Sequence, residues 1–363
     1  MDGAAVKRQL SWLLSGAFVV LLLIVIVAHN VTRPRILVLQ SYGTEYAWTR
    51  DVDVGIRRVF DDTGVAGNYE LRWHYMDLKR HPWPESKMAA GVQARHAIDE
   101  WRPDVLIAVD DDAQEYAAKY YANRPDIRIV FAGTNGSISP YGYDKADNVT
   151  GILERKPLTA IRDALIQIGF ARNGPLRIVE ICDASETVKL DHASIAAFDW
   201  KPLRYVGAHL VETFDDWQRA VLAADGEADV IMTTNYRKLS RSHIDRTLVP
   251  PDEVLAWTEQ HSQLPVIGTN AFFVEDGGML AIATSPFEQG ETAARMARQI
   301  IDRGTSPRDI AVATTRQYIV LARPGLLARH HLVLPSLYEA FARATNNYFE
   351  EADDTAAVPK GGK

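Results

Sequence analysis

Residues 36–60 read ILVLQSYGTEYAWTRDVDVGIRRVF, and this stretch sets the pattern of the whole chain. A short apolar run at 36–40 is followed by a polar turn and then by a segment at 48–60 with apolar residues at helical spacing. Short apolar runs rich in branched residues are typical of buried strands, and longer amphipathic segments are typical of helices. The stretch therefore predicts one strand–helix unit of an α/β protein.

The same alternation continues along most of the chain. Further strands are expected at 70–76, 105–109, 127–132, 176–181, 230–233 and 265–268. The helices between them are expected at 84–100, 113–122, 158–168, 186–197, 214–223, 252–261 and 289–303. Strands that are apolar throughout and alternate with helices predict doubly wound, mostly parallel sheets that helices cover on both faces.

The stretch 134–155 interrupts this rhythm with Gly, Ser, Pro and Tyr residues, and the alternation restarts after it. Such punctuation is typical of a crossing between lobes, which we expect near 149–152 and again near 269–274. The remaining boundaries follow from this division: a first lobe at 35–150 and about 270–304, a second lobe at 151–269 and about 305–335, a C-terminal helix at 336–349 and a disordered acidic tail at 350–363.

An uncharged apolar stretch, WLLSGAFVVLLLIVIVA, occupies residues 12–28. About 17 residues reach the lower end of the length with which a helix spans a bilayer. A cleaved signal peptide is the alternative, but the end of the stretch, Ile26-Val27-Ala28, lacks the small-x-small pattern of a cleavage site. We therefore expect a retained transmembrane anchor, with residues 1–11 on the cytoplasmic side and 29–34 as a short linker.

Composition and missing motifs exclude several classes of function. The net charge of -7 offers no concentrated basic surface for nucleic acid, and a single cysteine, Cys182, excludes an intramolecular disulfide. The chain contains neither GxSxG, a P-loop, HExxH nor CxxC. We expect no enzyme activity, no cofactor and no metal; the enzyme alternative is flavodoxin-like or hydrolase chemistry with Asp111 or Asp112 as a base.

Polar and aromatic residues follow six of the expected strands. Open parallel sheets bind ligands beyond the carboxyl ends of their strands. The residues expected to bind a small polar ligand are Ser41, Tyr42, Trp48, Asp111, Asp112, Thr134, Asn135, Ser185, Glu186, Asn235, Tyr236 and Asn270. In the simpler interpretation, the acidic and hydroxyl residues before helices are N-caps and the aromatic residues belong to the core.

The order of elements resembles the ABC transporter substrate-binding family of the tryptophan/tyrosine type, a branch of the type I periplasmic binding proteins. The resemblance rests on 36–60, on RPDVLIAVDDDAQEYA (102–117), IRIVFAGTNG (127–136) and NVTGI (148–152), and on 265–310. The opening segment is also similar to the extracytoplasmic sensor domains of bacterial histidine kinases. The resemblance implies two hinged lobes that close over a ligand, placed in the periplasm by an anchor in the inner membrane.

The predicted function is therefore a membrane-anchored periplasmic solute-binding protein that serves an ABC permease or a membrane signalling protein. A ligand-free interaction or sensory scaffold with the same fold is the alternative. Carboxylates at Asp111, Asp112 and Glu186 occupy positions where the transport family more often has neutral residues, and a buried carboxylate needs a partner. A cationic group on the ligand would supply that partner, unless all three are solvated helix caps.

Overall fold

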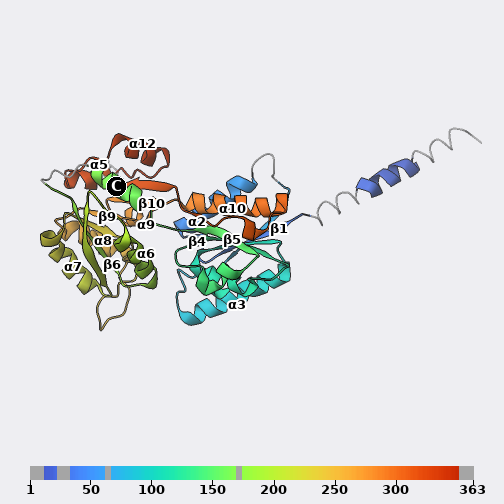
Figure 1. The fold of residues 1–363 in the computed structure, drawn as a ribbon, viewed down its shortest axis with the longest axis horizontal. Coiled ribbons are helices and arrows are strands. Elements are labelled where there is room, and N and C mark those ends of the chain that lie inside the picture. The colour runs from blue at the N-terminus through green and yellow to red at the C-terminus, as the bar shows by residue number, and fades with distance from the viewer. Residues whose placement is uncertain (1–11, 23–32, 62–66, 169–173, 351–363) are drawn as a thin grey trace, which may run out of the picture.

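The computed structural model describes residues 12–22, 33–61, 67–168 and 174–350. Within them the chain forms two lobes that lie side by side, each built on a six-stranded sheet (Figure 1). Neighbouring strands are parallel in both sheets except β10 (Leu280–Thr284) and β12 (Tyr318–Ala322), which are antiparallel. The predicted α/β fold with two mostly parallel sheets is therefore confirmed.

The sheet of the first lobe has the strand order β11-β5-β4-β3-β1-β2. Its strands are β1 (Arg35–Gln40), β2 (Glu70–Tyr75), β3 (Val105–Val109), β4 (Arg128–Thr134), β5 (Val149–Leu153) and β11 (Ala313–Thr314). Helices α2 (Ala47–Phe60) and α10 (Pro286–Arg303) pack on one face, and α3 (Pro84–Trp101) and α4 (Asp110–Tyr116) pack on the other. Single 3-10 turns lie at Ala118–Tyr121, Ser139–Tyr141, Tyr143–Lys145 and Pro307–Asp309.

The sheet of the second lobe has the order β12-β10-β9-β8-β6-β7. Besides β10 and β12, its strands are β6 (Arg177–Asp183), β7 (Arg204–Val211), β8 (Val230–Thr233) and β9 (Val266–Gly268). One face packs against α7 (Phe214–Glu227), α8 (Pro251–His261) and α9 (Phe272–Glu275). The other helices of this lobe are α5 (Leu158–Ile168), α6 (Glu186–Ala197), α11 (Pro324–Arg329) and α12 (Ser336–Ala344), which contribute to the core on the opposite face.

Strand β1 explains why these apolar runs become central strands. Its side chains alternate between two cores, Ile36 and Val38 on the α2/α10 face and Leu37 and Leu39 on the α3/α4 face. Successive side chains of a strand point to opposite faces, so a strand covered on both sides must be apolar at every position. The continuous apolar runs in the sequence therefore mark strands buried within a three-layer lobe.

Helices α2 and α10 cross at two glycines. A Cβ atom on Gly55 would lie 2.4 Å from the carbonyl oxygen of Phe287, and one on Gly290 would lie 2.1 Å from the carbonyl oxygen of Val52. Only residues without a side chain allow two helix backbones to approach so closely. The glycine pair thus attaches α10, which follows the strands of the second lobe, firmly to the first lobe.

The chain passes between the lobes at three places. It leaves the first sheet after β5 and enters α5 through residues 154–157, returns from β10 to α10 at Ser285, and leaves again between β11 and β12 through residues 315–317. These three segments are tied together, since the Glu288 carboxylate accepts hydrogen bonds from the backbone N–H groups of Arg316 and Gln317, and the Thr315 hydroxyl accepts one from the Arg155 N–H. They form the hinge.

The structure differs from the expected lobe boundaries. Residues 266–284 contain β9 and β10 of the second sheet, so the crossing expected near 269–274 is wrong; the return lies at Ser285. Strand β11 adds to the first sheet, although 305–335 was expected in the second lobe. Strands β5 and β10, which were not predicted, each lead directly into a crossing between the lobes. Helix α12 ends at Ala344, before the expected 349.

The expected membrane anchor is described only in part. Residues 12–22 are helical, whereas 23–28 lie outside the described residues, as do 1–11, 29–32 of the expected linker and 351–363 of the expected tail. No helix in the part of the chain that the structure describes is both long and apolar enough to cross a membrane.

Candidate ligand-binding cleft

A cleft of about 490 Å³ lies between the two lobes, at the carboxyl ends of strands from both sheets. Its volume falls within the range of small-molecule sites, which is about 300–1,000 Å³. Aromatic and charged side chains make up much of its wall: Tyr42, Tyr46, Trp48, Tyr141 and Phe272; Asp51, Asp110, Asp111, Asp112, Glu154, Asp191 and Glu275; and Lys79, Lys87 and Lys156. Amide, hydroxyl and aliphatic groups complete the wall.

Seven of the twelve residues predicted from the sequence line this cleft: Tyr42, Trp48, Asp111, Asp112, Asn135, Asn235 and Asn270. Four do not. Ser41 is buried and joins β1 to α4, since its hydroxyl donates to the Val109 carbonyl at 2.7 Å and accepts from the Ala113 N–H at 2.8 Å. The buried Tyr236 hydroxyl donates to Asp276 at 2.6 Å.

Thr134 and Ser185 also lie behind the wall of the cleft, and the hydroxyl oxygen of each is buried without a protein partner. Ser185 is the residue before α6, but its side chain makes no capping hydrogen bond. Glu186 begins α6, and the position of its side chain lies outside the described residues. Helix capping therefore does not explain the Ser185 hydroxyl.

Asp111 and Asp112 both have partners within the first lobe. The Lys87 ammonium lies 2.8 Å from Asp112 Oδ1. Asp111 accepts from the Tyr141 hydroxyl at 2.9 Å and from the Asn135 backbone N–H at 3.1 Å. The expectation that these two carboxylates need a cationic ligand as a partner is therefore wrong, because the protein already supplies the donors.

Asp110 has a different environment from its two neighbours. The residue is 4% exposed, and its Oδ1 accepts from Trp48 Nε1 at 3.0 Å, while the buried Oδ2 has no hydrogen-bond partner among the described residues. Burial raises the pKa of Asp110 well above its usual value, the Glu154 charge raises it further, and the Lys79 charge opposes both effects. Asp110 is thus a costly buried carboxyl group on the cleft wall.

The backbone of Asp110 is also unusual, with φ of 66°. A residue other than glycine in this left-handed region costs about 1–3 kcal/mol, and such residues concentrate at functional sites. Gly133 on the adjacent strand leaves room for the side chain, because a Cβ atom there would lie 2.7 Å from Asp110 Oδ1. The only sequence signal for this residue was its place as the first of three aspartates after a fully buried strand.

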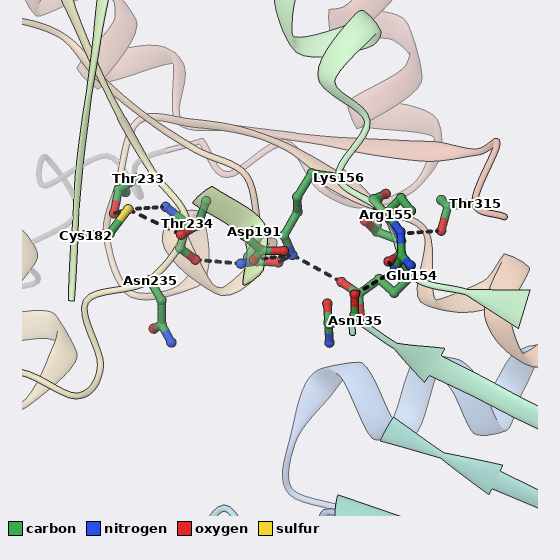
Figure 2. A network of polar contacts seen from close by, with 12 residues as sticks. Asn135, Glu154, Arg155, Lys156, Cys182, Asp191, Thr233, Thr234, Asn235 and Thr315 are labelled. Atoms are coloured by element: carbon green, nitrogen blue, oxygen red, sulfur yellow. Dashed lines mark hydrogen bonds and ion pairs between the residues drawn. The ribbon is translucent and has the colours of Figure 1, made fainter. Parts of the chain in front are cut away.

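The hinge contains a buried charge cluster centred on Lys156 (Figure 2). The Lys156 side chain is 5% exposed, and its ammonium lies 3.1 Å from Glu154, 3.6 Å from Asp191 and 2.9 Å from the Asn270 side-chain oxygen. Although burial disfavours a charged lysine, the charges of Asp191 and Glu154 raise the pKa of Lys156 above its usual value. One ammonium thus joins the hinge to two elements of the second lobe.

The neighbouring Arg155 ties the hinge to the first lobe instead. Its guanidinium donates to the carbonyl oxygens of Thr134, Asn135 and Gly136, in the loop after β4. Its backbone N–H donates to the Thr315 hydroxyl at 3.2 Å, in another crossing segment (Figure 2). Two adjacent hinge residues therefore contact different lobes, Arg155 the first lobe and Lys156 the second.

An aromatic corner lies beside the aspartates. The Lys79 ammonium stands 4.4 Å from the ring centre of Tyr42 and 5.0 Å from that of Tyr46, and the two rings meet edge to face. Such contacts are attractive because the faces of aromatic rings carry partial negative charge. Lys79 makes no ion pair within 4 Å among the described residues. Lys79 was not predicted as a site residue.

The fold and the interlobe cleft define a two-lobed binding protein of the periplasmic type. A model of the ABC transporter substrate binding protein family matches residues 54–323, so the chain belongs to that family. Membership implies a small-molecule ligand, an ABC permease as partner and an extracytoplasmic location, and a substrate-binding class favours binding over catalysis. No curated protein matches the chain.

Solved structures support the same fold. A ligand-free, open substrate binding protein with adhesive properties from Clostridium difficile has a TM-score of 0.63 at 15% identity and covers 88% of this chain and 100% of its own. An ABC domain in complex with L-Trp from Streptococcus pneumonia has a TM-score of 0.57 at 14% identity, over 85% and 98%. A conserved domain protein from Vibrio cholerae has 0.56 at 17%, also over 85% and 98%.

Proposed function

We propose that this chain is a membrane-anchored receptor that closes its two lobes over a small polar molecule and delivers it to an ABC permease. The observation that carries the proposal is the cleft of about 490 Å³, whose polar and aromatic groups come from both lobes. A ligand between the lobes interacts with the closed state more than with the open state, and this difference in affinity drives closure.

The residues proposed to contact the ligand are the neutral members of the predicted set that line the cleft. In the first lobe these are Tyr42, Trp48 and Asn135, and in the second lobe Asn235 and Asn270. Asp111 and Asp112 instead position Tyr141 and Lys87 around the ligand. The L-Trp complex of the pneumococcal domain makes an aromatic amino acid a sensible first probe.

Two alternatives differ from this proposal in their consequences. A ligand-free scaffold would have no need of a polar cleft, and the orphan carboxylate oxygen of Asp110 argues against it. A signalling receptor would bind the same kind of ligand but act on another membrane protein. Co-purification of the tagged chain with an ABC permease supports the transport receptor, whereas co-purification with a signalling protein supports the signalling receptor.

The full chain, purified in mild detergent, provides the test of ligand binding. Native mass spectrometry should find a co-purifying small molecule, and lobe closure can be followed by fluorescence transfer between Gln93→Cys on α3 and Ala223→Cys on α7. Both positions are exposed, whereas Cys182 is buried and protected from labelling. A chain that binds no small molecule and shows no change in transfer would support the scaffold.

The proposed anchor is tested separately. Fractionation of cells that express a C-terminally tagged chain should place it in the membrane with residues 1–28 intact. Release into the soluble periplasm, with a new N-terminus near His29, would establish cleavage and exclude a retained helix.

A further inference from the structure

Asp110 is the one carboxylate among the described cleft-lining residues with a buried oxygen that lacks a hydrogen-bond partner. Its neighbours Asp111 and Asp112 are satisfied by protein donors, and Glu154 and Asp191 share Lys156. An unpaired carboxylate is retained in a buried position only where something compensates it. No hydrogen-bond donor among the described residues reaches Asp110 Oδ2, which leaves a ligand in the cleft as the candidate donor.

We propose, on the basis of the proposed binding function, that Asp110 binds a protonated amino group of the ligand, and that the ligand class is organic amines with an apolar or aromatic body. Trp48 Nε1 already donates to Oδ1 and thereby orients the carboxylate, so Oδ2 is left for the ligand. The aromatic side chains Tyr42, Tyr46 and Phe272 provide surface for the body of the ligand.

The charge of the cleft favours a cation over a neutral or acidic ligand. Among the described residues, seven carboxylates and three lysines line it, and two of those lysines, Lys87 and Lys156, are already in ion pairs. Lys79 is the remaining cation, and it stands over the rings of Tyr42 and Tyr46 instead of pairing with Asp110 within 4 Å. An amine next to Asp110 therefore gains attraction from most of the surrounding wall.

The backbone of Asp110 makes a clean substitution available. Asparagine tolerates the left-handed region better than other residues and has nearly the size of aspartate. Asp110→Asn therefore keeps φ of 66° and an oxygen acceptor for Trp48 Nε1 while it removes the charge. Asp225→Asn, on the exposed surface of α7, is the matched control for the loss of one negative charge.

The test uses amines that are each matched with an alcohol and an acid of similar skeleton: tryptamine, tryptophol and indole-3-acetate; phenethylamine, 2-phenylethanol and phenylacetate; hexylamine, hexanol and hexanoate. Binding to the full chain in detergent is measured by the shift in Tm and then by calorimetry. We expect at least one amine to bind, its alcohol and acid not to bind, and Asp110→Asn to weaken the amine about tenfold or more, as for loss of a charged hydrogen bond. Asp225→Asn should match the unmodified chain.

The outcomes separate this inference from the proposed function. Three results would show that the amine class is wrong while the receptor function stands. An alcohol or acid could bind as tightly as its amine, or a neutral or acidic molecule could co-purify. Alternatively, Asp110→Asn could keep full affinity for the amine with its Tm unchanged. If no compound of the panel binds, none co-purifies and the lobes do not close, both are overturned. If Asp110→Asn fails to fold, the matched compounds on the unmodified chain still decide the ligand class.

Discussion

The two lobes contribute different chemistry to one cleft. The first lobe supplies Lys79, Lys87 and the three aspartates 110–112, whereas the second lobe supplies mainly amides, hydroxyls and apolar groups, such as Asn235, Asn270 and Thr187. Of these, Lys87, Asp111 and Asp112 are held by partners in the same lobe. We expect from this difference that the first lobe contributes more to selection by charge than the second lobe, which has fewer carboxylates on the cleft wall, Asp191 and Glu275.

A substitution of the hinge residue Lys156 should cause the largest loss of stability, because charged groups from both lobes meet at its ammonium. Lys156→Met leaves Glu154 and Asp191 buried without their cation, and removing one partner of a buried ion pair costs about 3–5 kcal/mol of unfolding free energy. Chemical denaturation measures the loss, with Lys145→Met on the surface as the control. A loss below about 1 kcal/mol would mean that the hinge is not held by charge.

Two helical glycines provide the next contrast between the lobes. Gly290→Ala in α10 places a Cβ atom 2.1 Å from the Val52 carbonyl oxygen, and overpacking of this kind costs about 1–3 kcal/mol. Gly226→Ala in α7 of the second lobe has open space around it and should stabilise by up to about 1 kcal/mol through helix propensity. Equal shifts in Tm for both variants would contradict the close crossing of α2 and α10.

The pH dependence of amine binding tests whether Asp110 of the first lobe binds the amine as a carboxylate. Burial, the charge of Glu154 and the charge of Asp111 raise the pKa of Asp110 in the empty cleft, and a bound cation lowers it. Binding therefore releases a proton, and affinity rises with pH by up to about tenfold per unit until Asp110 is ionised in the empty protein. Asp110→Asn should flatten this dependence.

Calorimetry across pH, in buffers of different ionisation enthalpy, measures the number of protons released. The other ionisable groups that act on Asp110 are Lys79, Glu154, Asp111, Tyr42 and Tyr46. An unchanged slope in Asp110→Asn would assign the titration to one of these groups.

The smallest expected effect belongs to the second lobe. Asn235 uses its side-chain oxygen to accept from the backbone N–H groups of Tyr236 and Arg237, which leaves its amide N–H₂ for the ligand. Asn235→Ala should weaken binding by about 1 kcal/mol, the usual contribution of a neutral hydrogen bond. Ligand titration measures this, with Tm as the check on folding. A loss as large as that of Asp110→Asn would show that both lobes select the ligand equally.

Much of the fold could be predicted because most central strands buried on both faces have a continuous apolar run in the sequence. Five strands were missed, β5, β7, β10, β11 and β12. β7 lies at a sheet edge with most of its residues only half-buried, and β12 is the one antiparallel addition after a crossing. Their places depend on pairing with distant strands, which local patterns do not encode.

The sequence could predict that the candidate site lies at the ends of the strands, but it could not predict which side chains there contact one another. The Lys87–Asp112 pair joins different elements, and the Lys156–Asp191 pair joins the hinge to α6, so neither is visible as a motif. The three consecutive aspartates look alike in the sequence. Only the burial and the partners of each carboxylate distinguish Asp110 from the other two.

The three crossings also constrain how the protein is made. Helix α10 covers one face of the first sheet together with α2, yet it follows every parallel strand of the second sheet along the chain. During synthesis, the apolar surface at Val52 and Ile56 therefore emerges long before Ala293 and Ala297 can cover it. Until α10 is synthesised, the nascent first lobe exposes this apolar surface. Chains that expose such surface are bound by chaperones and are prone to aggregate.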